Sequence, residues 1–340
     1  HYMDSLSVTL PKDYTVHIPG NKQTVSVPKT KDTTLAIKTV SNTRSYPVVS
    51  TPIVFSKQMN VLKSFTSSGK TISIYFLSKV KPSNVQKMLG WAKDIFEFYE
   101  SKYGPRPFNH LTIINTPFPQ LWGMAGDETI FLGDAMFRSS TLLSDAYMQR
   151  ARYYLLAHEI GHLWSGIGAV TDFESENVFS EGLTEYITYD LFVEKFGDSG
   201  NLFPPDTYGL SEYFLTLFTE NALISPSFTL SDAPHYSYQS MVKNNFDLPA
   251  MSSQEDRYLN SQTTLFYDKG VLLFNTLEDY VGKPNFQKAL QAYFKKPLST
   301  DSNFKTFKRF INKYATVSSE KITAFFDTWF KSASYMDYSI

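Results

Sequence analysis

The residues best suited to chemistry form one short segment, in which His158, Glu159 and His162 stand at the spacing HExxH. On a helix, positions i and i+4 lie on one face about one turn apart, so both imidazoles can reach a single metal ion. The chain contains no cysteine, so any metal must be held by histidine and carboxylate groups. The segment therefore predicts a zinc site, with one Zn²⁺ ion per chain.

A catalytic zinc ion takes three protein ligands and keeps one position open. Glu181, on a second predicted helix, is the expected third ligand beside His158 and His162. Glu185 lies one turn further along, where its carboxylate can accept a hydrogen bond from a ligand imidazole. Zinc lowers the pKa of its water to about 7, and Glu159 is then placed to act as the general base. The predicted chemistry is hydrolysis by a metal-activated water.

The competing interpretation is that these are ordinary structural residues of a buried helix. The chain has six histidines among 340 residues, so a chance HExxH is improbable. A structural helix would also bury adjacent polar groups among Leu155, Leu156, Leu163 and Trp164, which is costly when they are unpaired. Both considerations favour the metal site.

Hydrophobic periodicity and turn signals indicate the elements that position these residues. Strands are expected at residues 14–18, 24–27, 71–76, 110–115 and 128–132, the last two being candidate neighbours in one sheet. Helices are expected at 82–103, 145–164, 176–196, 212–223, 265–280, 286–294, 304–314 and 319–329. Residues 225–262 show little periodicity and are predicted to form a long irregular excursion. Strands followed by helices predict an α+β fold.

Composition limits the classes of partner. Hydrophobic residues make up 42% of the chain, enough for a sizeable core, and the net charge of −1 argues against a nucleic-acid partner. No apolar run approaches the roughly 20 residues that span a bilayer. Lysine and arginine are scattered, which predicts solvated positions for them. The opening HYMDSL is not a leader, so we expect an internal or processed start, and the cysteine-free composition favours an extracytoplasmic or secreted location; oligomeric state is not predicted.

The segment from His158 to Tyr186 resembles the zinc signature of the M1 (gluzincin) aminopeptidases. It contains HExxH, whose second histidine, His162, also begins HLWSG. The sequence SEGLTEY follows in place of the family's NEGFAEY, with 18 residues between His162 and Glu181. The resemblance implies a thermolysin-like zinc peptidase catalytic domain, with a small mixed sheet lobe and a helical lobe, and a peptide or protein substrate. It covers roughly residues 50–335, which predicts a β-rich N-terminal segment at 1–50 and the catalytic domain at 51–340, without the family's large C-terminal helical domain.

A second motif of the family, Y-x-K-G, is matched by Tyr267-Asp268-Lys269-Gly270. The resemblance implies that Tyr267 donates a hydrogen bond to the oxyanion of the tetrahedral intermediate. The alternative is an ordinary tyrosine at the edge of the core.

The family's GxMEN segment, whose glutamate binds the substrate amine, is degenerate here. Gly123 and Met124 are kept, but Ala125 stands at the glutamate position. Asp127 or Glu128 would replace the anchor only after a shift in register, which changes the reach and can change the face of a strand, so we expect both to be turn carboxylates. Backbone pairing with a substrate through Gly123, Met124 and Ala125 needs no particular side chain.

Three functions follow from these observations. The resemblance favours a zinc aminopeptidase. Ala125 favours an endopeptidase or a peptidase of other specificity that lacks the amine anchor. A non-catalytic zinc-binding scaffold is the third alternative, disfavoured because the ligands, the base and Tyr267 are all present.

Overall fold

The computed structural model describes residues 5–20, 22–26, 37–43, 50–138, 145–169, 171–172, 174–197, 232–252, 264–295 and 303–333. The chain divides into two compact units. The first comprises residues 1–101, 105–139 and 155–163, and the second comprises residues 102–104, 140–154 and 164–340. The predicted boundary at residue 50 stays a prediction.

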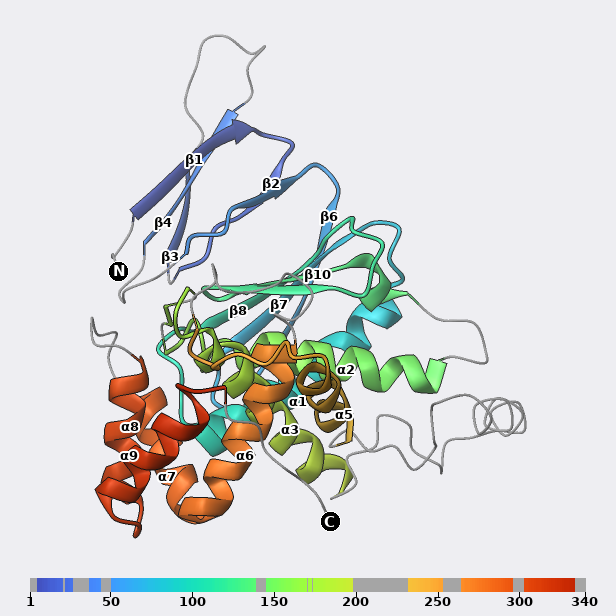
Figure 1. Ribbon diagram of the computed structural model, residues 1–340. Helices are drawn as coiled ribbons and strands as arrows, with labels where there is room; N and C mark the ends of the chain where they lie inside the picture. The colour runs from blue at the N-terminus through green and yellow to red at the C-terminus, as the bar shows by residue number, and fades with distance from the viewer. Residues whose placement is uncertain are drawn as a thin grey trace, which may run out of the picture. The chain divides into compact units, whose positions relative to one another are not determined.

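The N-terminal part of the first unit is made of short antiparallel strands (Figure 1). One sheet has the order β1-β4-β3 and a separate pair joins β2 to β5. Their bounds are Ser5–Pro11 for β1, Thr15–His17 for β2, Lys22–Ser26 for β3, Ile37–Thr43 for β4 and Val54–Ser56 for β5. Leu10, Val16, Ile18 and Val40 form the hydrophobic core of this part. The strands predicted at 14–18 and 24–27 are confirmed.

A five-stranded mixed sheet forms the rest of the first unit's β structure, with the order β6-β7-β8-β10-β9. The bounds are Met59–Phe65 for β6, Thr71–Leu77 for β7, His110–Asn115 for β8, Gly123–Gly126 for β9 and Thr129–Leu132 for β10. The central pairs β7–β8 and β8–β10 are parallel, which confirms the predicted neighbours at 110–115 and 128–132. The antiparallel partner of β10, β9, stands at the edge of the sheet.

Helix α1 (Pro82–Tyr103) buries one face because its apolar residues recur at helical spacing. Val85, Met88, Ala92, Ile95 and Tyr99 are all at most 1% exposed. Tyr99 Oη donates a hydrogen bond of 3.1 Å to the carbonyl of Ala157, the residue before the first expected zinc ligand. The predicted helix at 82–103 is confirmed, and it holds the zinc-binding segment in place.

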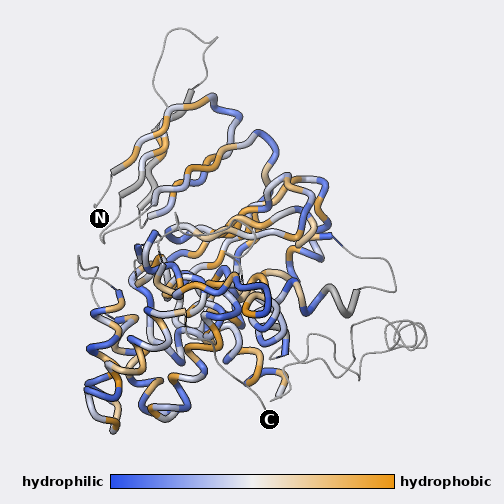
Figure 2. The backbone as a smooth tube through the Cα atoms, viewed as in Figure 1, coloured by the Kyte–Doolittle hydropathy of each residue, from blue (hydrophilic) through white to orange (hydrophobic). Residues whose placement is uncertain are grey.

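The second unit is helical. Helix α2 (Asp145–Gly161) begins in it, and a 3₁₀ turn (Asn177–Phe179) leads into α3 (Glu181–Phe196). The others are α5 (Asp232–Lys243), α6 (Lys269–Val281), α7 (Lys283–Phe294), α8 (Asn303–Tyr314) and α9 (Ser319–Trp329). Helices α7 to α9 alternate between hydrophobic and hydrophilic residues along their length (Figure 2). Phe307 of α8 and Phe330, which follows α9, both contact Phe179 of the 3₁₀ turn and Phe274 of α6 in an aromatic core.

Two predictions about secondary structure need correction. Residues 232–243 form α5, not irregular chain, because Tyr238 and Met241 supply a short buried stripe among many polar residues. Helix α2 ends at Gly161, three residues earlier than predicted. The helix predicted at 212–223 and much of 225–262 lie outside the described residues. The predicted α+β class, with a small mixed sheet and a helical part, is confirmed. Among the helices that the structure describes, none is long and apolar enough to cross a bilayer.

Candidate metal centre and catalytic site

The two histidines of the HExxH segment lie at the end of α2. His158 is in its last turn, and His162 follows the helix by one residue while its N–H still donates to the carbonyl of His158 at 3.2 Å. Their rings are perpendicular, with centroids 4.7 Å apart. His158, Glu159 and His162 are only 4–8% exposed. Because His158 and His162 are themselves almost fully buried, their rings have little freedom to move.

Glu181 is the first residue of α3. A carboxylate at a helix N-terminus is stabilised by the helix dipole. The turn before it is fixed by Ser165, whose buried Oγ donates a 2.5 Å hydrogen bond to the carbonyl of Phe179. This hydrogen bond supports the backbone of the turn that leads to Glu181.

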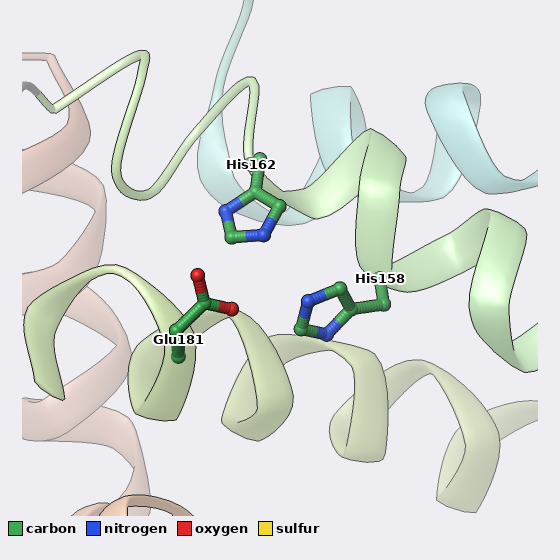
Figure 3. A group of neighbouring side chains, drawn as sticks. All are labelled: His158, His162 and Glu181. Atoms are coloured by element: carbon green, nitrogen blue, oxygen red, sulfur yellow. The ribbon is translucent and has the colours of Figure 1, made fainter. Parts of the chain in front are cut away.

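The structure brings His158, His162 and Glu181 together. Their candidate ligand atoms all lie within 4.8 Å of one another, and the three side chains converge on one point (Figure 3). Two imidazoles and one carboxylate form a donor set that catalytic zinc takes. Ligand atoms of one tetrahedral zinc ion are about 3.4 Å apart, so small side-chain rotations suffice to bind it. The residues present fit a zinc ion.

Glu159 lies against the edge strand β9. A Cβ atom built on Gly123 would stand 2.5 Å from both Cγ and Oε1 of Glu159. Real Cβ atoms do not approach other atoms so closely, so a side chain at position 123 would force the Glu159 side chain to shift. The predicted base and the predicted substrate-pairing strand are therefore in direct contact.

This contact gives a first prediction. Gly123→Ala should displace the Glu159 carboxylate and lower kcat about 100-fold with little change in zinc content, because an ångström of misplacement costs about that much. Steady-state kinetics and metal analysis check it. Gly90→Ala is the matched control, since an added methyl group there meets nothing within 4 Å. Normal turnover by Gly123→Ala would show that the contact is unimportant for catalysis.

The remaining residues of the degenerate GxMEN segment lie partly on β9 and partly in the turn that follows it. On β9, Met124 is 50% exposed and Ala125 is partly buried. Asp127 and Glu128 form the two-residue turn between β9 and β10, where Glu128 takes a φ of +55°. The Asp127 carboxylate accepts two hydrogen bonds from Ser50. The backbone N–H of Ser50 donates one at 2.6 Å, and its hydroxyl donates the other at 2.9 Å. The geometry agrees with the expectation that both are turn carboxylates.

Glu185 lies one turn beyond Glu181 on α3 and accepts a hydrogen bond from the hydroxyl of Tyr154. Its predicted bond with a ligand imidazole stays a prediction. Tyr154 was not predicted from the sequence as part of this site, although a signal was present. It precedes His158 by four positions, the spacing that puts two residues on one helix face.

Tyr267 lies in a π-helical turn (Thr264–Asp268) that leads directly into α6. This segment packs closely on the start of α3. A Cβ atom on Gly182 would stand 2.7 Å from both the Phe266 carbonyl and Gly270 Cα. The two glycines of SEGLTEY and Y-x-K-G therefore allow the Tyr267 segment to lie directly against the first turn of α3.

A titratable carboxyl group follows Tyr267. Burial raises the pKa of Asp268 to about 7, the negative charge of Glu185 acts in the same direction, and hydrogen bonds with Ser237 and Thr264 oppose them. The unfolded chain loses this proton near pH 4, so the folded protein holds it more tightly between about pH 4 and 7. The resulting stability is present below pH 4 and is lost as the pH rises to 7.

A second prediction follows for the metal-free protein. The contribution of Asp268 to the free energy of unfolding should fall between pH 4 and 7, so the wild-type and Asp268→Asn curves should diverge by on the order of 2 kcal/mol across this range after allowance for solvent screening. Denaturant unfolding of chelator-treated protein across this range measures it. Asp94→Asn, which changes an exposed carboxylate on α1, is the control. An Asp268→Asn curve parallel to the wild-type curve would contradict the assignment.

Comparison with known sequences supports the site's chemistry. The peptidase family M1 domain matches residues 87–329. The chain is 22% identical over 264 residues to the tricorn protease-interacting factor F2 of Thermoplasma volcanium, an alignment that covers 76% of this chain and 30% of that protein. It is 25% identical over 242 residues to human endoplasmic reticulum aminopeptidase 2, covering 69% of this chain and 22% of that protein. The chain thus spans less than a third of these relatives.

Solved structures share the fold. An M1 zinc metallopeptidase from Deinococcus radiodurans superposes with a TM-score of 0.65 at 15% identity, covering 98% of this chain and 65% of that one. Aminopeptidase A of Legionella pneumophila, solved with aspartic acid, gives 0.68 at 13% identity, covering 97% and 34%. The family match extends over most of the chain and includes the His158–Glu181 segment. The chain belongs to peptidase family M1.

Proposed function

We propose that this chain hydrolyses peptide bonds with a zinc ion held by His158, His162 and Glu181, most simply as an aminopeptidase. One observation carries the proposal. The ligand atoms of these three residues lie within 4.8 Å of one another, and Glu159 stands between the two histidines in sequence. Membership of family M1 and aminopeptidase relatives support the same activity.

Each residue of the site has a separate role in the reaction. When bound, zinc would supply a Lewis acid acting on the scissile carbonyl and on the attacking water. Glu159 takes the water proton and returns it to the leaving amine. Tyr267 donates a hydrogen bond to the carbonyl oxygen as negative charge develops there. Strand β9 offers backbone groups to an extended peptide, and Gly123 leaves room for Glu159 beside it.

A second candidate, an endopeptidase or a peptidase of other specificity, is favoured by one specific observation. Ala125 stands where the family's amine-binding glutamate is expected, and the nearby Asp127 already accepts two hydrogen bonds from Ser50. An aminopeptidase built in this way must bind the free amine of its substrate through a different residue. Charge on the substrate amine therefore distinguishes the two candidates.

A pair of matched reporters tests this. A free-amine aminoacyl reporter should be cleaved at least about tenfold faster than its N-acetylated form if the chain is an aminopeptidase, since each 1.4 kcal/mol of amine binding is a factor of ten. Preference for the blocked form would exclude the aminopeptidase and favour the second candidate. Absence of cleavage of either reporter and of an unfolded protein, in zinc-loaded protein, would favour the non-catalytic scaffold.

A further inference from the structure

Lys269, in the Y-x-K-G motif, is fully buried. Its side chain is 0% exposed, and its Nζ donates hydrogen bonds of 2.7 Å to Asp247 Oδ1 and of 2.7 Å to the carbonyl of Leu248. The scattered lysines were expected at solvated positions, so this placement is a correction. A buried ammonium group is tolerated only when it is paired and hydrogen-bonded, as Lys269 is.

The partners of Lys269 are themselves fixed. Tyr238 of α5 donates a 3.1 Å hydrogen bond to Asp247 Oδ2, and its ring lies 5.6 Å from Lys269 Nζ. The neighbouring Asp268 is hydrogen-bonded to Ser237. Both residues that follow Tyr267 are therefore tied to one group of residues, Ser237, Tyr238, Asp247 and Leu248, which we name the α5 clamp.

The opposite side of the same segment is also constrained. Gly270 meets Gly182 so closely that a Cβ atom on Gly270 would lie 2.6 Å from Gly182 Cα, and the Phe266 carbonyl faces Gly182 as well. Gly182 follows Glu181 directly. The π-helical turn of Tyr267 thus lies between the α5 clamp and the helix turn that carries a zinc ligand.

We propose that Lys269 is a positioning residue for Tyr267. Its ion pair with Asp247 anchors the start of α6 to the α5 clamp, and this fixes the π-helical turn so that the Tyr267 hydroxyl faces the oxyanion. A side chain that only filled space would need no charge, whereas an ion pair with two short hydrogen bonds specifies one geometry. The inference rests on the proposed function, because it uses the oxyanion role of Tyr267.

A double-mutant cycle tests the role. Lys269→Met should lower kcat about 100-fold and change KM less than about threefold. The reason is that the Tyr267 hydroxyl, which acts only in the transition state, is no longer held in position. In a Tyr267→Phe background, the same change should lower kcat less than about twofold further, since coupled residues are not additive. Zinc content should stay at one ion per chain. Additive losses of kcat, or loss of zinc, would overturn the proposal.

A readout that needs no turnover accompanies the kinetics. 3-Fluorotyrosine placed at position 267 should give one ¹⁹F resonance in the wild type, and Lys269→Met should shift it or split it. Lys331→Met, which breaks an exposed i,i+4 ion pair with Asp327, should leave it unchanged. An unshifted resonance in Lys269→Met would overturn the proposal. If the wild type proves inactive, the proposed function fails, and this resonance alone decides whether Lys269 positions Tyr267.

A folding defect is handled by a second variant. Lys269→Met leaves the Asp247 carboxylate buried without its ammonium partner. An uncompensated buried charge destabilises the folded protein. The double variant Lys269→Met/Asp247→Leu removes that charge, and its folding is followed by thermal melting. It should fold and still show the altered Tyr267 resonance and the lowered kcat. A folded double variant with wild-type resonance and kcat would overturn the proposal.

Discussion

The Glu159→Gln variant should bind zinc as the wild type does and lose peptide hydrolysis by about 10³-fold. Glutamine keeps the size and one carbonyl oxygen of the side chain but cannot take a proton, and general-base catalysis contributes about 10²–10⁴-fold. Glu159 is 5% exposed and touches the Gly123 backbone, so the amide should occupy the same place. The loss should appear in kcat, with little change in KM, because the proton transfer occurs in the transition state.

The measurement combines metal analysis of the purified variant with turnover of an aminoacyl reporter over a range of pH. Glu194→Gln is the matched control, since Glu194 lies on α3 with 62% of its side chain exposed. It should keep full activity. Near-normal hydrolysis by Glu159→Gln would remove Glu159 from the mechanism, and loss of zinc from this variant would assign it to the metal site.

The second large effect is expected at the third ligand. Glu181→Ala should weaken zinc binding by more than about 100-fold, because it removes a direct ligand, and even changes to residues that only support ligands cost 10–100-fold. The same change should remove the stabilisation that bound zinc gives to the folded protein, so added zinc should no longer raise the melting temperature. His162→Ala should behave alike.

Zinc titration followed by calorimetry, together with melting curves in zinc and in chelator, measures both effects. Glu194→Ala, on the same helix, should retain wild-type affinity and the zinc-dependent rise in melting temperature. If Glu181→Ala binds zinc as tightly as the control does, the third ligand has been assigned wrongly. Retention of zinc by both ligand variants would place the ion elsewhere.

Local patterns predicted many of the elements because each one needs only neighbouring residues. The apolar spacing in α1 and the β8 sequence Leu111-Thr112-Ile113-Ile114, rich in β-branched residues, are strong signals of this kind. Helix α5 was missed because it exposes a polar face and buries only a narrow stripe around Tyr238 and Met241. Periodicity is a weak signal in so short a segment.

The metal ligands were predictable because HExxH fixes two of them by helical geometry, and the SEGLTEY segment supplies the third. Packing between distant segments was not predictable. Nothing near Gly123 in sequence indicates that it touches Glu159. Lys269 was expected at a solvated position because lysine and arginine are scattered along the chain. Its partner, Asp247, precedes it by 22 positions, and no local pattern indicates that the two pair. Pairing of buried charges is a property of the tertiary fold.

The most direct test of the zinc site is a crystal structure of the zinc-loaded protein with anomalous data collected on both sides of the zinc absorption edge. We expect one strong peak per chain, about 2.0–2.2 Å from a nitrogen of His158, a nitrogen of His162 and a carboxylate oxygen of Glu181. Glu159 should stand beside the remaining open position. A peak elsewhere, or these three side chains directed apart in the presence of ample zinc, would contradict the proposed mechanism.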